Sequence, residues 1–500
     1  MMTHTALTRT SRILLTVFIM TAAVMNQVDV TIANVALPHI QGSTSASREQ
    51  IGWVLTSYIV AMAIFIPMVG WLANRFGRRR VMLVSILCFT FASGLCGIAV
   101  NLEELILFRM LQGMSGAALV PLSQATLFDI NPPEEHGKAM TIFGLAAITG
   151  PLFGPLLGGW LTENFSWRWC FLINLPLGLF SWMGLSAFMP EFRQEDSSRL
   201  DFLGFGLLAL AIGSIQLMLD RGQILDWFDS AEIWTYAMMS LTCIYMFVVH
   251  SLTTRSPFVS LAVFADRNFV ICSAVGFFLG ILIYSPMALL PQMLEGLMGY
   301  PIMEVGVVLA PRGIGVLFAM LVMGRIIQHV EYRLLIVIGM LITGAAMYEM
   351  SSLSLQADER LIITTGIAQG IGSSMIFVPL TTMAFATLPA RYRNEASAVN
   401  TLLRNFGASV GIAVTQALAV RTTATVQSRL TEGLRPDNPA IRAGAPDLDL
   451  NSPQVAAELS REAFRQASMV SYVDIFWAMF LVATLASLLV LLLRSPPKGR

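Results

Sequence analysis

Long apolar stretches alternate with short polar stretches along nearly the whole chain. Each apolar stretch holds about 20 residues, which as a helix is long enough to cross a hydrocarbon core of about 30 Å. The pattern therefore predicts an all-α integral membrane protein that crosses the bilayer many times.

The apolar stretches predict 14 transmembrane helices, which would place both termini on one side of the membrane. In the first half the helices are expected near residues 13–37, 51–72, 81–100, 104–128, 139–161, 168–190 and 200–220. In the second half they are expected near residues 232–252, 269–290, 304–325, 334–353, 360–386, 396–420 and 470–494.

The composition agrees with a membrane protein and excludes several other classes. Hydrophobic residues make up 55% of the chain and charged residues 12%, against about 25% charged residues in soluble proteins. The 31 basic and 31 acidic residues cancel, so no net charge favours binding to nucleic acid. The five cysteines lie in apolar stretches without metal-ligand spacing, which argues against disulfides and zinc.

Basic residues predict the orientation, because short loops rich in Lys and Arg stay in the cytoplasm. Most of them fall in loops or tails on the same side as the N-terminus: Arg75, Arg78, Arg79, Arg80, Lys138, Arg193, Arg199, Arg255, Arg267, Arg325, Arg333, Arg391, Arg393, Arg494, Lys498 and Arg500. Both termini are therefore expected in the cytoplasm. The long polar segment 421–468 is expected outside it, since long segments translocate regardless of charge.

Two series of residues repeat at a nearly constant offset. Gln112, Gly113, Pro121, Gly150 and Gly154 in the first half are matched by Gln369, Gly370, Pro379, Gly407 and Gly411 in the second. A duplication predicts a six-helix bundle over 1–190, two inserted helices over 191–268, and a second six-helix bundle over 269–500 with the loop 421–468. Two related halves are typical of transporters, with the substrate site near the midplane between them.

The first motif follows the second predicted helix, where the chain reads Gly70-Trp-Leu-Ala-Asn-Arg-Phe-Gly-Arg-Arg-Arg80. Its glycines permit a tight turn, and arginines at a membrane surface can serve simply as a topology anchor. The stretch also resembles a signature of the major facilitator superfamily, which there latches the outward-facing state at the cytoplasmic ends of the helices.

The resemblance implies that Gly70, Arg75, Gly77 and Arg79 belong to this latch. Asn74 stands where the family usually has Asp, so Arg75 and Arg79 are expected to pair with another anion, such as Asp129.

Two ionisable residues are expected inside predicted helices, Asp29 in the first and Arg109 in the fourth. An arginine at the centre of a span costs about 2.5–3.5 kcal/mol to insert, so each residue should be paired or face a wet interior. The stretch around Arg109, Leu107-Phe-Arg-Met-Leu-Gln112-Gly113, resembles a family motif associated with proton coupling. We expect Asp29 to meet Arg109 in one state of the transport cycle and not in another, so that its carboxyl would release and take up a proton. Alternatively, Arg109 is an interhelical tether and Asp29 a structural carboxylate, with Asn34, Arg312 and Arg404 equally able to serve the site.

The fifth predicted helix reads Gly150-Pro151-Leu-Phe-Gly154-Pro155-Leu-Leu-Gly158-Gly159. Residues four apart share a helix side, so the glycines permit close approach of another helix. Packing alone would explain them. The doubled Gly-Pro also resembles the antiporter signature of drug-exporting facilitators.

Further matches occur at Asp29–Pro38, Trp167–Gly178 and Ala310–Gly315. Along nearly the whole chain the sequence is similar to the fourteen-span drug:proton antiporter family, and most similar to its EmrB-type multidrug exporters. The resemblance implies a bacterial inner-membrane location, protons as coupling ion without another cofactor, and a periplasmic adaptor with an outer-membrane channel as partners. It also implies a substrate cavity, for which the candidates are Asn34, Gln112, Arg312 and Arg404.

The favoured function is therefore proton-coupled efflux of hydrophobic or amphipathic small molecules. An exporter dedicated to one endogenous metabolite, such as a fatty acid or siderophore, fits the same residues. A membrane-embedded enzyme is disfavoured, because no catalytic set of carboxylates, nucleophile and base, or metal ligands stands out and the five histidines are scattered. A channel is disfavoured by the internal repeat.

Overall fold

The computed structural model describes residues 9–132, 135–191, 200–254, 257–327, 329–389, 392–432 and 452–494, apart from a few side chains within helices. Throughout these residues the secondary structure is helical, with connecting turns and loops. Six basic residues used to predict the orientation lie outside them: Arg193, Arg199, Arg255, Arg391, Lys498 and Arg500. The all-α fold class is confirmed.

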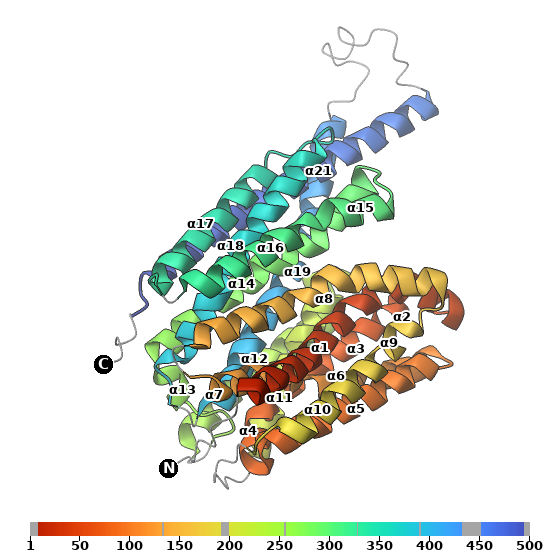
Figure 1. Ribbon diagram of the computed structural model, residues 1–500. Helices are drawn as coiled ribbons and strands as arrows, with labels where there is room; N and C mark the ends of the chain where they lie inside the picture. Colours follow the sequence, from red (N-terminus) through yellow and green to blue (C-terminus); the bar gives the residue numbers. More distant parts are fainter. Residues whose placement is uncertain are drawn as a thin grey trace.

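The N-terminal bundle packs around α1, which contacts α8 and α10 along its length (Figure 1). A second layer pairs α3 and α5 with α6. The helices of this bundle are α1 (Arg9–Thr44), α2 (Arg48–Ile51), α3 (Trp53–Phe65), α4 (Met68–Phe76), α5 (Arg78–Ile98), α6 (Leu102–Gly116), α7 (Leu119–Ile130), α8 (His136–Asn164), α9 (Trp169–Leu172) and α10 (Asn174–Phe188).

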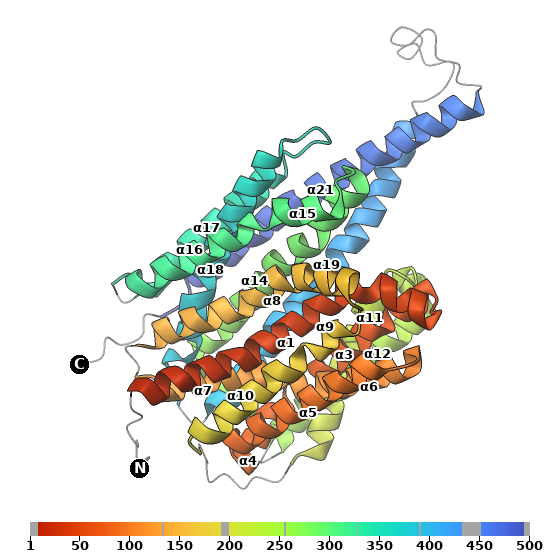
Figure 2. The ribbon, with the colours of Figure 1, turned by 45° about the vertical axis from the view of Figure 1, so that its right-hand side comes forward.

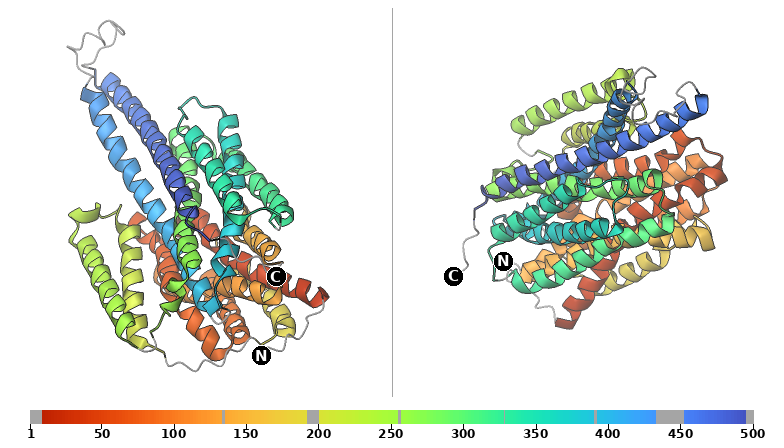
Figure 3. Two further views of the ribbon diagram at one scale, coloured as in Figure 1. Left: turned by 90° about the vertical axis from the view of Figure 1, so that its left-hand side faces the viewer. Right: turned by 90° about the horizontal axis from the view of Figure 1, so that it is seen from above.

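Two long helices follow and stand to one side of the bundles (Figure 3). They are α11 (Phe202–Arg221) and α12 (Ala231–Thr253), with the short η2 (Trp227–Asp229) between them and α13 (Ala262–Ala265) after them. Packing of α11 against α3 and α19 ties the pair to both halves, whereas α12 packs mainly on α11. One face of α12 therefore has no helix of the described chain packed against it.

The C-terminal bundle repeats the plan, with α14 packed on α19 and α18 packed on α16 and α17. Its elements are α14 (Arg267–Gln292), η3 (Met293–Leu297), α15 (Ile302–Leu309), α16 (Pro311–Ile326), α17 (Tyr332–Met350), α18 (Glu359–Ala386), α19 (Arg393–Glu432) and α21 (Pro453–Val490). The predicted helices fall on these elements, with most boundaries shifted by a few residues.

Within the described residues, eleven helices are long and apolar enough to cross a membrane, or twelve if the bent pair α3 and α4 forms one span. That pair is bent by 55°, beside Pro67, whose ring removes a backbone donor and disfavours a continuous helix. The long helices α8 and α19 run beside these candidates in the bundles. The count of 14 spans is consistent with this arrangement and remains a prediction.

Helices extend into the predicted loop 421–468 from both of its ends, so the connecting segment is shorter than expected. Helix α19 continues to Glu432, and α21 begins at Pro453 rather than near residue 470. The residues from Pro453 onward, which fall within the predicted loop, form the first part of α21. Hydropathy could not reveal these extensions, because a helix satisfies its own backbone hydrogen bonds and does not end where its apolar residues end.

The two bundles meet at one end of the molecule and diverge towards the other (Figures 1 and 2). Contacts between them come from α8 with α16 and α18, and from α19 with α4 and α7. At the diverging end, α19 and α21 project together beyond the other helices (Figure 2). We call the closed end the latch end, because the turn between α4 and α5 lies there.

Candidate functional site

The centre of the N-terminal bundle holds a buried ion pair between Asp29 on α1 and Arg109 on α6. Both side chains are inaccessible to solvent, and an Arg109 guanidinium nitrogen lies 2.6 Å from Asp29 Oδ2. The other carboxylate oxygen accepts hydrogen bonds from Gln112 Nε2 and Asn174 Nδ2, each at 2.8 Å. Every one of these contacts treats Asp29 as an acceptor, as an ionised carboxylate requires.

Further contacts hold Arg109 in place from two other helices. Its Nε donates to the carbonyl oxygen of Val54 at 3.2 Å. Its guanidinium carbon lies 4.1 Å from the centre of the Tyr58 ring and 5.5 Å from that of Phe171, a favourable arrangement for a cation. Removing one member of such a buried pair costs about 3–5 kcal/mol, so the cluster strongly constrains α1, α3 and α6.

Sequence reasoning predicted that Asp29 and Arg109 would meet, and the structure brings them together. It missed Asn174 and Ser93, whose hydroxyl oxygen accepts hydrogen bonds from Gln112 and Asn174. Asn174 lies in a stretch noted for its family resemblance, but one sequence cannot show which helix face turns inward.

Asn34, a candidate for the substrate cavity, does not join this cluster. Its side chain is exposed, and five residues along a helix place it on nearly the opposite side of α1 from Asp29. Gln112, another candidate, is fully buried and hydrogen-bonded to the ion pair.

The glycine row of α8 packs directly against α1. A Cβ atom on Gly150 would come within 2.2 Å of the carbonyl oxygen of Gln27, and one on Gly158 within 2.9 Å of that of Ile32. Gly159 has more room, since its nearest neighbour would be 3.9 Å away. The expected close helix approach is present, and the helix concerned carries Asp29. The side chains of Pro151 and Pro155 lie outside the described residues.

At the latch end, Asp129 at the end of α7 binds two arginines from different halves. Arg78 contributes a guanidinium nitrogen at 2.5 Å, and Arg393 of α19 pairs with the other carboxylate oxygen. The expected partners, Arg75 and Arg79, were wrong: Arg75 is exposed, and Arg79 donates to the backbone carbonyl of Ser186.

The physical reason lies in the turn that starts α5. Gly77 has a φ of 87°, a backbone conformation that favours glycine, and α5 begins directly after it. Successive helical residues then point about 100° apart, so only one of three consecutive arginines faces Asp129. That residue is Arg78, which is 2% exposed, and the sequence alone does not identify it.

Asn74, the departure from the family signature, also bridges the two halves. Its side-chain oxygen accepts a hydrogen bond of 2.7 Å from Asn394 of α19. Gly70 lies one helical turn earlier, where an added Cβ would be 3.0 Å from Glu395 Cα. Ser397, one turn further along α19, donates to Gln124 of α7 at 3.0 Å. These contacts close the latch end without a carboxylate at position 74.

The C-terminal bundle contains two arginines in its interior, Arg312 on α16 and Arg404 on α19. Arg312 is half-buried and donates to the carbonyl of Ile283 at 3.1 Å. Arg404 is 9% exposed, with its guanidinium carbon 5.3 Å from the centre of the Phe377 ring. Both arginines lie against the same part of α14, because an added Cβ on Gly280 would come within 2.3 Å of the Arg404 carbonyl oxygen, and Ile283 follows Gly280 by one helical turn. Among the described residues, neither arginine forms a salt bridge with a carboxylate.

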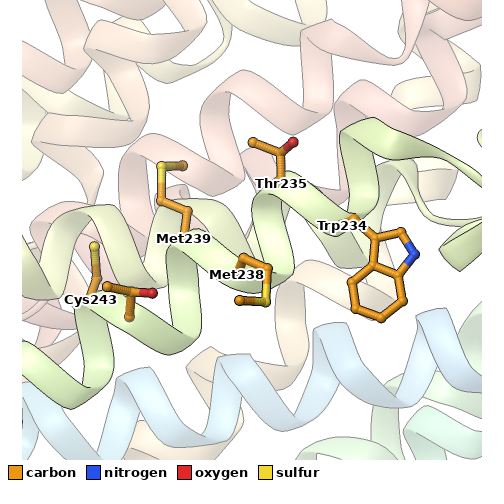
Figure 4. Close-up of a pocket in the computed structure, with 6 residues that line it drawn as sticks. Trp234, Thr235, Met238, Met239 and Cys243 are labelled. Carbon is orange, nitrogen blue, oxygen red and sulfur yellow. The ribbon is translucent and has the colours of Figure 1, made fainter.

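A shallow hollow runs along α12, where Trp234, Met238, Met239 and Cys243 line it (Figure 4). All of its lining residues come from one helix, and that helix packs mainly on α11. A surface formed by a single outer helix has no converging polar groups, so we assign it no function.

A family model described as the Major Facilitator Superfamily matches residues 19–412. The chain is 35% identical to the multidrug export protein EmrB of Haemophilus influenzae, covering 97% of this chain and 96% of that protein. It is 33% identical to the fatty acid resistance protein FarB of Neisseria gonorrhoeae, covering 91% of each.

Among solved structures, the chain is similar to the human organic anion transporter MFSD10. The TM-score is 0.60 at 12% identity, covering 94% of this chain and 99% of the other. At such low identity the likeness concerns the fold alone.

Proposed function

We propose that this chain, which belongs to the Major Facilitator Superfamily, exports hydrophobic or amphipathic small molecules in exchange for protons. The two six-helix halves would rock about a central substrate site and expose it to each side in turn. The relatives named multidrug export protein and fatty acid resistance protein support export as the direction of transport.

The buried pair of Asp29 and Arg109 is the observation that carries the proton-coupling proposal. Here the carboxylate is enclosed by donors from α6 and α10. If rocking of the halves separates Asp29 from Arg109, the carboxylate loses its positive partner in a low-dielectric interior. The protonated, neutral form of Asp29 is then favoured over the ionised form. Alternation between the two situations would couple proton uptake to the transport cycle.

The latch contacts support an assignment of this conformation as outward-facing. Asp129, Asn74 and Ser397 join the halves at the end where the basic loops lie, and those loops are cytoplasmic by the positive-inside rule. The opposite end, where the bundles diverge, would then release substrate. An entering proton would draw on the membrane potential, worth about 2.3 kcal/mol per charge per 100 mV.

In the same proposed orientation both termini would lie in the cytoplasm of a bacterium, with the protein in the inner membrane. The projecting ends of α19 and α21 would then lie in the periplasm, where a helical pair reaching beyond the bilayer offers a contact for an adaptor protein. An outer-membrane channel would complete the export route.

A second candidate is an exporter dedicated to one endogenous product, such as a fatty acid. The observation that favours it is the pair of arginines, Arg312 and Arg404, for which the described residues supply no carboxylate. The similarity to a fatty acid resistance protein points the same way.

Reconstitution into liposomes tests the proposed function. A pH gradient is imposed, and accumulation of the neutral fluorescent amphiphile phenylnaphthylamine and of radiolabelled laurate is followed, with protein-free liposomes correcting for passive distribution. We expect accumulation against a gradient that stops when nigericin collapses the pH difference. Transport that is indifferent to the pH difference would contradict proton coupling.

A further inference from the structure

We infer that Arg312 and Arg404 form a binding site for the anionic head of a single-chain amphiphile, with a carboxylate as the preferred group. The inference rests on the proposed function and deepens it by naming a substrate class. It starts from a difference between the two repeats.

Packing of the glycine rows fixes how the repeats correspond. In the first half an added Cβ on Gly150 would meet the carbonyl oxygen of Gln27, and in the second half one on Gly407 would meet that of Phe277. Two residues further along each helix, Asp29 corresponds to Leu279, which is fully buried. The second half therefore has an apolar side chain where the first has its carboxylate.

The arginine of the first half is also replaced. Gln112 and Gln369 correspond in the repeat, so Arg109 corresponds to Gly366. An added Cβ on Gly366 would lie 3.7 Å from Cβ of Arg312, so the aliphatic part of Arg312 packs beside this vacant position. The second half thus has positive charge near its centre from another helix, without the matching acid.

Neither arginine has a carboxylate partner in the part of the chain that the structure describes. Two such cations are expensive in a membrane protein, because charge in a low-dielectric interior must be paired or hydrated. The hydrogen bond to Ile283 uses one of the five guanidinium donors of Arg312. For Arg404, the described residues supply a ring face and no hydrogen-bond acceptor within range. A bound carboxylate would supply both the charge and the acceptors, in the two-pronged geometry that guanidinium groups favour.

The side chains around Arg404 are suited to bind the apolar tail of an amphiphile. Phe377, which lies under Arg404, stacks on Phe143 of the other half with ring centres 6.2 Å apart. Met320 of α16 lies close to Gly144 on the same helix as Phe143. Flexible and aromatic side chains from both halves can repack around an apolar tail. A head group held by Arg404 would place that tail where the halves move against each other.

Binding to the purified full-length protein in nanodiscs tests this assignment without any gradient. The probes are radiolabelled laurate, and phenylnaphthylamine as the neutral amphiphile, with dodecylamine as a cationic competitor. The nanodiscs contain phosphatidylcholine alone in one set and an added fraction of phosphatidylglycerol in another. The second set shows whether lipid phosphate rather than a free carboxylate fills the site.

We expect R404Q and R312Q each to weaken laurate binding about tenfold, the effect of losing a hydrogen bond to a charged group, and to leave phenylnaphthylamine binding unchanged. R404K should recover part of the affinity, since it restores the charge. The matched control is R168Q: Arg168 also donates to one backbone carbonyl and lies over one ring, of Trp167, but in the N-terminal half. It should bind laurate like the unmodified protein.

Equal loss of the neutral and anionic probes would overturn the anion site, as would unchanged laurate binding in both variants or displacement of laurate by dodecylamine. Loss of laurate binding in phosphatidylglycerol nanodiscs would overturn the assignment to an exported carboxylate. Failure of the proposed function looks different: probe binding would stay selective for the anion, while no amphiphile accumulates under a pH gradient.

Discussion

In the N-terminal half the central arginine, Arg109, is neutralised by Asp29 and enclosed by donors and rings. In the C-terminal half Arg312 and Arg404 have no carboxylate among the described residues, and the positions related to the first pair hold Leu279 and Gly366. The two halves share the close packing at their glycine rows, but they differ in the charged residues at their centres. Their difference suggests a division of labour, in which one half handles the proton and the other binds the anionic head of the substrate.

The largest effect is expected from Asp29→Asn. Without Asp29 the buried central cluster of the N-terminal half loses its carboxylate, so uphill transport in proteoliposomes should fall to the protein-free background, while downhill exchange and ligand binding persist. The control is Asp474→Asn, because Asp474 is exposed on α21. Normal elution on size-exclusion chromatography must accompany the result, since an unpaired Arg109 is costly.

If the Asp29→Asn protein still accumulates substrate under an imposed pH difference, Asp29 is not the coupling carboxylate. If it loses exchange as well but elutes normally, the pair would be structural rather than a proton carrier.

Glycine variants test the feature that the halves share. A Cβ at Gly154 would come close to the Thr31 hydroxyl, and one at Gly411 within 2.5 Å of that of Ser285. Gly154→Val and Gly411→Val should each force their helices apart and reduce turnover about tenfold or more, an effect of about 1.4 kcal/mol or more on the barrier. Gly159→Ala is the control, because its Cβ would have 3.9 Å of room.

Transport rates at equal protein level measure this effect. Normal rates for both valine variants would show that the helices packed at the glycine rows can move apart without loss of transport. Close packing there would then not be required for the geometry of the halves.

A smaller effect is expected at the latch end, where the first repeat has a carboxylate, Asp129, at a position that is apolar in the second. Asp129 corresponds to Ala386 in the second half. Asp129→Asn weakens its charged hydrogen bonds to Arg78 and Arg393, each worth about 1.5–3 kcal/mol. The outward-facing population should therefore fall about tenfold or more relative to the inward-facing one.

Spin labels on the exposed residues Phe76 and Leu334 report this change as a longer distance between the halves by electron resonance. Glu135→Gln serves as control, since the partner of Glu135, Arg12, belongs to the same half. An unchanged distance distribution for Asp129→Asn would mean that Asn74 and Asn394 suffice to hold the latch.

The smallest functional effect concerns the helical extension, which only the C-terminal half carries. Thr425→Cys on α19 and Ser460→Cys on α21 replace exposed side chains, so transport should be unaffected. Both cysteines should react with an impermeant maleimide added outside intact spheroplasts, whereas Arg80→Cys should react only after permeabilisation. The reverse labelling pattern would invert the proposed orientation.

Sequence alone predicted the helices and the central pair because lipid imposes simple demands on both. A span needs about 20 apolar residues, and an isolated charge within it needs a partner. Those demands stop at the membrane surface, so the extensions of α19 to Glu432 and of α21 from Pro453 were missed. Which neighbour faces inward is set by helix rotation, and for this reason Arg78 and Asn174 were not identified.

The linkage between proton and substrate is tested most directly by measuring proton release on ligand binding. Laurate is added to the purified protein in weakly buffered solution, and the pH change is compared between the unmodified protein and Asp29→Asn at equal laurate occupancy. The account predicts that laurate binding releases protons from the unmodified protein, because a proton on Asp29 and an anion at Arg404 belong to alternate states of the cycle, and that Asp29→Asn binds laurate without this release. Equal proton release from both proteins would contradict the division of labour between the halves.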